Sequence, residues 1–223
     1  MNQQFSFSAS LKSLHLLNHP FYQDWMAGKL SKETLQDYAA QYYSHVRAFP
    51  RYISAIHSLC ENDQSRQILL ENLNDEEGVS YGTSHPDLWL RFAQGLGVER
   101  EKVQSTEFRS GINTVVETFF RLARSSFHEG LGALYAYEHQ IPEIATSKIE
   151  GLQKMYRISD KKTLEFFAVH QTADIYHREA VEKILFSLPE KEKQEALNAA
   201  KIAAQTLWDF LTEVHGKNQN VLQ

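Results

Sequence analysis

The stretch SKETLQDYAAQYYSHVRAFPRYISAIHSLC, residues 31–60, decides the fold class. Its large apolar side chains recur every three or four residues, at Leu35, Tyr38, Tyr42, Val46 and Phe49. That spacing places them on one face of an α-helix, and Ser31 is a good N-cap for the first turn. Pro50 lacks a backbone N–H, so we expect it to kink the helix or to divide it in two.

The rest of the chain repeats this helical pattern. A short helix is expected to open at Pro20 and to end near Gly28. Longer helices are expected at about 63–78, 86–97, 110–128, 130–154, 160–188 and 189–216, with a loop at GVSYGTSHPD (78–87). No alternation of strands and helices appears. We therefore predict one all-α domain over residues 1–223, a bundle of about seven or eight helices with short flexible ends at about 1–8 and 216–223.

The composition excludes several classes of protein. Lys and Arg total 23 against 28 Asp and Glu, a net charge of −5, so no basic field predicts nucleic-acid binding. A single cysteine, Cys60, excludes a disulfide within the chain and a zinc site built on cysteines. We see neither a signal-peptide pattern nor an apolar run long enough to span a membrane. A cytoplasmic protein with no membrane partner is expected.

Candidate chemistry begins with HQTADIYH, residues 170–177. At 100° per residue, His170, Asp174 and His177 fall at about 0°, 40° and −20°, on one stripe of a helix. Apolar residues before and after them (164–168 and 180–184) continue that stripe toward the core. Two imidazoles and one carboxylate suit Fe, Mn or Zn. The alternative is a solvated polar face with incidental histidines.

Two other segments supply further ligand types. Glu76 and His85 are nine residues apart, so they converge only if the chain bends, which Gly78 and Gly82 permit. The alternative there is a capped helix end with exposed acidic groups. Glu138 lies among small and apolar residues, which predicts a buried carboxylate. Carboxylate-bridged dinuclear sites in helical bundles use this mixture of groups. The candidate metal ligands are Glu76, His85, Glu138, His170, Asp174 and His177.

Long segments of the chain also resemble a known family. They are HPFYQDW (19–25), DYAAQYYSHVRAFPRYISAIHSLC (37–60), NLNDEE (72–77), ALYAYEHQIPEIATSKIEGL (133–152) and HQTADIYH (170–177). The chain resembles, from about residue 14 to 211, the family of the chlamydial protein associating with death domains. This family is a branch of the TenA/PqqC-like superfamily. The resemblance implies a haem-oxygenase-like fold and a dinuclear centre (Fe/Fe, Mn/Fe or Mn/Mn) on these six ligands. It also implies dioxygen as co-substrate and an external reductant.

The resemblance further implies synthesis of para-aminobenzoate for folate from the protein's own side chains. Tyr22 matches the tyrosine that gives up its ring, Lys148 the lysine that supplies nitrogen, and Tyr137 a tyrosine that relays an electron or radical. The further relay candidates are Tyr38, Tyr42 and Tyr43. Without the resemblance, Tyr22 is better interpreted as a core tyrosine and Lys148 as a solvated lysine.

Several alternatives stay open at this stage. The glutamate-to-histidine spacing is two residues shorter in the chlamydial member, so Glu77 is an alternative to Glu76. The chain could be a dimetal oxidase for an external small molecule, or a non-enzymatic protein that binds death domains. A thiaminase-like reaction would need Cys60 as its nucleophile, although core packing suits that residue better. A homodimer is expected, and the sequence does not identify the electron donor.

Overall fold

The computed structural model describes residues 6–79 and 82–221, apart from the side chains of 172–174 and 218–221. The described chain contains helices and turns and no strand. Its α-helices are α1 Phe7–Leu11, α2 Pro20–Met26, α3 Lys32–Ser58, α4 Asp63–Glu76, α5 His85–Gly95, α6 Arg100–Gln104, α7 Ser110–Ser125, α8 Phe127–Glu138, α9 Ile141–Lys154, α10 Lys161–Ser187 and α11 Glu190–Val221. Two short 3₁₀ turns, η1 Lys12–Leu14 and η2 Leu16–Asn18, precede α2. The all-α prediction is confirmed.

The described residues form eleven α-helices rather than seven or eight, because three were not expected. Helices α1 and α6, of five residues each, lie in segments for which no helix was predicted. The expected helix over 130–154 is two helices, because the chain leaves α8 at His139 and starts α9 at Ile141. Pro142 lies in the first turn of α9, where the missing N–H costs no helical hydrogen bond. The prediction of one continuous helix there was wrong.

Helix α3 is continuous through its proline. It runs for 27 residues with Pro50 inside, so the division in two does not occur. Ser31 caps it as predicted, and its side chain accepts a hydrogen bond from the N–H of Thr34. Burial of apolar side chains along its whole length stabilises the helix against the loss of one backbone hydrogen bond. Helix α3 therefore connects both ends of the bundle.

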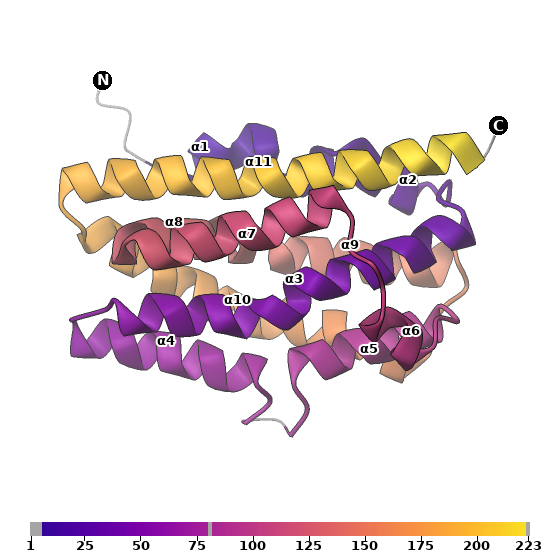
Figure 1. Ribbon diagram of the computed structural model, residues 1–223, viewed down its shortest axis with the longest axis horizontal. Helices are drawn as coiled ribbons and strands as arrows, with labels where there is room; N and C mark the ends of the chain where they lie inside the picture. The colour runs from indigo at the N-terminus through magenta and orange to yellow at the C-terminus, as the bar shows by residue number, and fades with distance from the viewer. Residues whose placement is uncertain (1–5, 80–81, 222–223) are drawn as a thin grey trace.

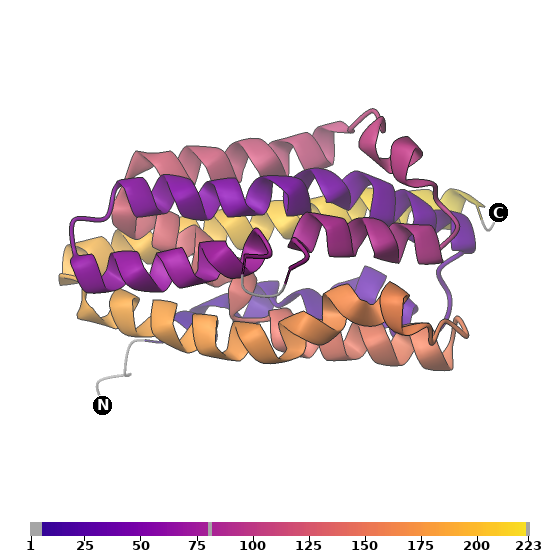
Figure 2. The same cartoon turned by 90° about the horizontal axis from the view of Figure 1, so that it is seen from below.

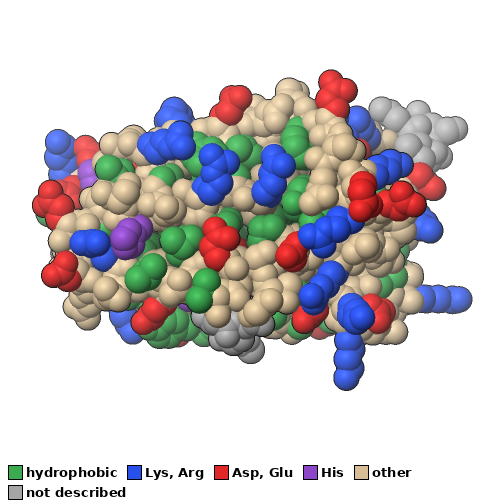
Figure 3. Space-filling view, turned by 60° about the horizontal axis from the view of Figure 1, so that its bottom comes forward, with side chains coloured by type: hydrophobic (Ala, Val, Ile, Leu, Met, Phe, Trp, Pro, Cys, Tyr) green, Lys and Arg blue, Asp and Glu red, His purple; other side chains and the backbone are tan. Residues whose placement is uncertain are grey.

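The long helices surround one hydrophobic core. Helix α11 lies along one side and packs on α8 and α7, while α10 packs on α9 and α5 (Figure 1). Seen from below, α4 and α5 follow one another end to end between α3 and α10, and the turn between them interrupts that row (Figure 2). On the face in Figure 3, Lys and Arg side chains are interspersed with Asp and Glu. Among the residues described, no helix combines the length and the apolar character that a membrane crossing requires.

Candidate functional site

The turn between α4 and α5 brings the first two candidate ligands together. Helix α4 ends at Glu76 and α5 begins at His85, whose Nδ1 lies 3.0 Å from Oε2 of Glu76. Gly78 has φ +75°, and a Cβ there would lie 2.4 Å from the backbone N of Ser84, so this bend requires glycine. Glu77 is exposed and forms the C-cap of α4. Of the two glutamates, Glu76 is the one that faces His85.

His170 of α10 approaches the same point from the other side of the bundle. Its ring centroid is 4.4 Å from that of His85, and ligand atoms of Glu76, His85 and His170 all lie within 4.8 Å of one another. The Nδ1 of His170 donates to the carbonyl oxygen of Phe166 at 2.5 Å. This contact fixes the tautomer and leaves Nε2 as the lone-pair atom, as in metal-binding histidines.

Glu138 of α8 and His177 of α10 add two more buried groups. Oε1 of Glu138 accepts a hydrogen bond of 2.6 Å from Asn72, and Nε2 of His177 lies 3.1 Å from Oδ2 of Asp75. Each of these two predicted ligands thus has one atom held by a residue of α4 and one atom without a hydrogen-bond partner. The side chain of Asp174, the sixth candidate, lies outside the described residues.

Burial controls the protonation of this cluster, because all five described ligands are 5 % exposed or less. Burial and, to a smaller extent, the charge of Glu76 raise the pKa of Glu138 to about 8, against the opposing effect of the Asn72 hydrogen bond. Burial also lowers the pKa of His170 well below its usual range. For His85, burial favours the neutral ring, but the charge and hydrogen bonding of Glu76 outweigh it and raise the pKa.

The donor atoms of the cluster fit a redox metal. In the part of the chain that the structure describes, six buried side-chain atoms have no hydrogen-bond partner. Three of them belong to predicted ligands: Glu138 Oε2, His177 Nδ1, and His85 Nδ1 apart from its 3.0 Å contact with Oε2 of Glu76. Leaving such atoms unsatisfied is costly, and metal coordination satisfies buried nitrogen and oxygen atoms of this kind. Imidazole nitrogens with carboxylate oxygens suit first-row metals such as iron and manganese.

Lys148 of α9 occupies a second buried centre, which we call the aromatic chamber. Its side chain is 4 % exposed, and Nζ donates to the hydroxyl of Tyr38 at 2.6 Å. Six aromatic rings have centroids within 5.8 Å of Nζ, those of Tyr22, Trp25, Tyr38, Tyr42, Trp89 and Phe167. Burial lowers the pKa of Lys148 to about 7. The interpretation of Lys148 as a solvated lysine was wrong.

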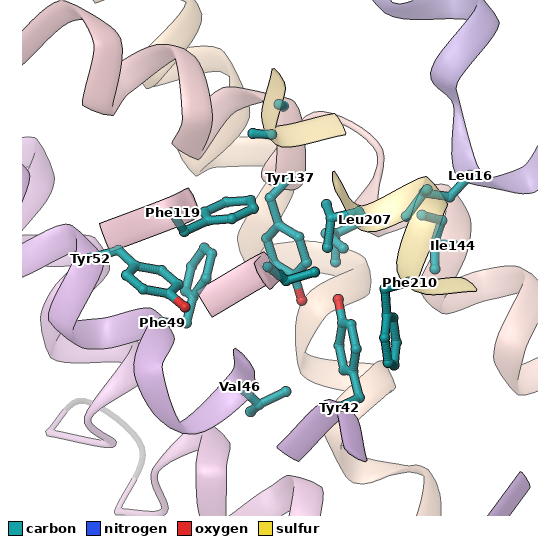
Figure 4. Close-up of a cluster of buried hydrophobic side chains, with 14 of the residues drawn as sticks. Leu16, Tyr42, Val46, Phe49, Tyr52, Phe119, Tyr137, Ile144, Leu207 and Phe210 are labelled. Carbon is teal, nitrogen blue, oxygen red and sulfur yellow. The ribbon is translucent and has the colours of Figure 1, made fainter. Parts of the chain in front are cut away.

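The tyrosines of the chamber form two hydrogen-bonded pairs. The hydroxyls of Tyr22 and Tyr38 are hydrogen-bonded, and the Tyr22 ring centroid is 5.5 Å from Nζ of Lys148. The hydroxyls of Tyr42 and Tyr137 are also hydrogen-bonded and point toward one another in Figure 4. Tyr38 and Tyr42 stack with ring centroids 5.2 Å apart, which joins the two pairs. Burial raises the pKa of Tyr22 far above its usual value.

A small cavity connects the chamber with the ligand cluster. It has a volume of about 20 Å³, and Tyr22, Tyr137, Lys148 and His170 are among the residues that line it. Such a volume holds one molecule of the size of water or dioxygen. The structure therefore brings together all three side chains predicted to react and one of the predicted ligands. The other relay candidate, Tyr43, packs against the guanidinium of Arg47 instead, 5.7 Å from its ring centroid.

Two residues of the site were missed by the sequence analysis. Asn72 lies one turn before Glu76 on α4, within the segment NLNDEE, so its contact with Glu138 follows from i,i+4 spacing once α4 is placed. Asp75, in the same segment, holds His177. Cys60, in contrast, is buried, and burial raises the pKa of its thiol, which opposes a nucleophilic role.

Comparison with known proteins agrees with a redox-metal site in this chain. Residues 36–208 match the family model described as iron-containing redox enzyme. The chain is 42 % identical over 204 residues to a 4-aminobenzoate synthase of Chlamydia pneumoniae, covering 91 % of this chain and 90 % of that one. It is 41 % identical over 219 residues to a 4-aminobenzoate synthase of Nitrosomonas europaea, covering 92 % and 87 %.

A solved structure shows the same fold at low sequence identity. It is a domain of unknown function with a haem-oxygenase-like fold from Shewanella denitrificans, with a TM-score of 0.81 at 16 % identity, covering 97 % of this chain and 92 % of that one. The predicted fold is thereby confirmed. With the family match over most of its length, this chain belongs to the haem-oxygenase-like family of iron-containing redox enzymes, and within it to the group that contains the 4-aminobenzoate synthases.

Proposed function

We propose that this protein makes 4-aminobenzoate from the ring of Tyr22 and the nitrogen of Lys148, with dioxygen as co-substrate and an external reductant. The names of its relatives support the product. The aromatic chamber supports the source of the atoms, because Tyr22 and Lys148 lie side by side there, with the ring centroid 5.5 Å from Nζ. This contact is the observation that carries the proposal.

The chemistry of the product matches these two side chains. In 4-aminobenzoate an amino group lies para to a carboxylate, and in tyrosine a hydroxyl lies para to Cβ. The conversion breaks the Cα–Cβ bond of Tyr22, oxidises Cβ to the carboxylate and replaces the phenol oxygen, which leaves as water, with the nitrogen of Lys148. The Cε–Nζ bond of Lys148 breaks in the same conversion, and dioxygen with the external reductant supplies the redox equivalents. A pair of redox metals held by the six predicted ligands would supply the oxidising power, with electrons from the reductant.

The chamber prepares Lys148 to act as a nucleophile. An ammonium group cannot form a bond to carbon, and burial among aromatic rings favours the neutral amine, with the pKa lowered to about 7. Tyr38 accepts a hydrogen bond from Nζ and is also hydrogen-bonded to Tyr22, so one residue holds both reactants in position.

Tyr42 and Tyr137 connect the chamber with the ligand cluster. Tyr137 precedes the ligand Glu138 in the chain, and its hydroxyl is hydrogen-bonded to that of Tyr42. Tyr42 in turn stacks on Tyr38. A tyrosine can lose an electron when its proton moves to a hydrogen-bonded neighbour. These contacts therefore support the proposed role of Tyr137 as a relay between the metal site and Tyr22.

Isotope labelling tests the proposal. The protein is expressed with ring-¹³C tyrosine, loaded with iron and manganese, and given dioxygen and a reductant without any aromatic substrate. We expect labelled 4-aminobenzoate, about one per chain because the source is covalent, and a loss of mass in the peptide that contains Tyr22. Tyr22→Phe should make none, whereas Tyr135→Phe, which removes the hydroxyl of another buried tyrosine outside the chamber, should make the normal amount. Product from Tyr22→Phe would refute the assignment.

An oxidase acting on an external small molecule is the second candidate. The cavity of about 20 Å³ opposes it, because the protein's own rings fill the space that an aromatic substrate would need. Product formed over many turnovers from an added aromatic acid would favour this candidate instead.

A further inference from the structure

A second pocket lies near the aromatic chamber, at the surface of the bundle. It opens between the start of α3, the end of α5 and the segment that follows α9, and has a volume of about 380 Å³, within the range of small-molecule sites. Leu35, Tyr156 and Ile158 form its apolar wall, and Lys32 lies among its polar residues. It shares no lining residue with the cavity beside His170. It is therefore a separate pocket, which the proposed reaction does not use.

The pocket lies close to Lys148, with Trp25 as a shared neighbour. The ring of Tyr156 lies 6.0 Å from that of Trp25, and the Trp25 ring lies 5.8 Å from Nζ of Lys148. On α3, Leu35 precedes Tyr38 by three residues and lies on the same face of the helix. Trp25 is thus a neighbour both of Lys148 and of Tyr156, which lines the pocket.

The residues of the pocket suit an aromatic carboxylate. Lys32 is exposed, and among the residues that the structure describes no carboxylate forms an ion pair with it. Its ammonium lies close over Gly97, since a Cβ there would be 3.8 Å from Nζ. The Tyr156 hydroxyl accepts a hydrogen bond from the N–H of Leu30 at 3.3 Å, which holds its ring against the pocket. A fixed aromatic face beside an unpaired cation complements a flat anion.

We propose that this pocket binds the product on its way out of the protein, with the carboxylate at Lys32 and the ring against Tyr156. The inference rests on the proposed function, because a product released from Tyr22 is larger than the cavity in which it forms. The product has to leave a chamber whose side chains are almost fully buried. Movement of Trp25, which neighbours both Lys148 and Tyr156, would open a route from the chamber to a pocket with a matching charge.

Binding of 4-aminobenzoate tests the pocket without any turnover. The metal-loaded Tyr22→Phe protein is used, and affinity is measured by calorimetry or ligand-observed NMR. We expect Lys32→Glu in this background to weaken binding at least tenfold. The matched control is Lys29→Glu, an exposed lysine three residues away that does not line the pocket. Aniline, which lacks the carboxylate, should bind weakly to all three proteins. Equal affinities of the Lys32→Glu and Lys29→Glu proteins would overturn the proposal.

Release of product gives a second, independent measurement. Ile158→Trp places a large side chain in the pocket, so labelled product from a single turnover should stay with the protein during rapid gel filtration, whereas wild-type protein should release it. Equal release from both proteins would contradict the route. If neither protein makes labelled product, the proposed function fails, and the binding measurement still decides whether the pocket takes aromatic carboxylates.

Discussion

The ligand cluster and the aromatic chamber are both buried polar centres, and they are built in opposite ways. The cluster brings a carboxylate and two imidazoles from α4, α5 and α10 together, and two buried atoms of further predicted ligands, Glu138 Oε2 and His177 Nδ1, have no hydrogen-bond partner. The chamber places one amine among six aromatic rings, and that amine has its hydrogen bond to Tyr38. The cluster thus has buried polar atoms that a bound cation would satisfy, whereas the amine in the chamber already has a hydrogen-bond partner.

This difference shows how burial serves two kinds of chemistry. In both centres burial favours neutral forms, with the pKa of Glu138 raised to about 8 and that of Lys148 lowered to about 7. A cation would reverse the effect in the cluster, because it stabilises carboxylates and neutral imidazoles as ligands. Nothing in the chamber reverses it, so Lys148 keeps a reactive lone pair. Changes in one centre should therefore leave the other intact.

The largest expected effect comes from removing a ligand. We expect His170→Ala to lose most of the roughly two equivalents of metal per chain that a dinuclear site holds, together with product formation. His57→Ala, which changes a histidine of α3 outside both centres, should keep its metal. Elemental analysis of proteins expressed with ample iron and manganese gives the comparison. Full metal content in His170→Ala would show that the cluster is not the metal site.

The converse change removes the amine of Lys148. Lys148→Met should make no product while it keeps its metal, and it should be more stable than the wild type at neutral pH. A lysine pKa lowered from 10.5 to about 7 corresponds to a cost of burial of about 5 kcal/mol, which the thioether avoids. Chemical denaturation measures the difference, and loss of metal from Lys148→Met would show that the two centres are not independent.

The pH dependence of stability sharpens this test. Between about pH 7 and 10.5 the unfolded chain binds a proton at Lys148 that the folded chain does not. The contribution of Lys148 to stability therefore rises with pH across that window, and the full cost applies below it. The advantage of Lys148→Met should shrink steadily as pH increases from 7 toward 10.5. A constant advantage would mean that the buried amine remains charged.

The cluster was largely predictable from the sequence, because local patterns encode it. The stripe of His170 and His177 follows from helical periodicity, and the bend that joins Glu76 to His85 follows from glycine. The division at Pro142 was missed, although proline in the first turn of a helix is a known pattern. The break between α8 and α9 has a structural role, because the side chain of Gln140, which lies in it, accepts a hydrogen bond from the backbone N–H of Leu16.

The chamber could not be predicted from the residues alone. Its side chains come from α2, α3, α5, α9 and α10, and no local spacing relates helices that are distant in the chain. Aromatic residues such as Trp25, Trp89 and Phe167 are typical of any hydrophobic core. Only resemblance to a family singled out Tyr22 and Lys148. The hydrogen bond from Lys148 to Tyr38 depends on tertiary packing, which places α9 against α2 and α10.

The smallest expected effect concerns a residue that holds a ligand without binding metal itself. Asn72 donates to Oε1 of Glu138 at 2.6 Å, and this contact orients the carboxylate. We expect Asn72→Ala to weaken metal affinity about 10- to 100-fold, because outer partners of metal ligands typically contribute that much. The matched control is Asn74→Ala on the same helix, since residues two apart face different directions. Metal titration with a competing chelator measures both affinities. Equal affinities would show that the hydrogen bond from Asn72 does not orient Glu138 for metal binding. A loss of affinity confined to Asn72→Ala, with Lys148 still buried and reactive, would show that the defect lies in the cluster alone.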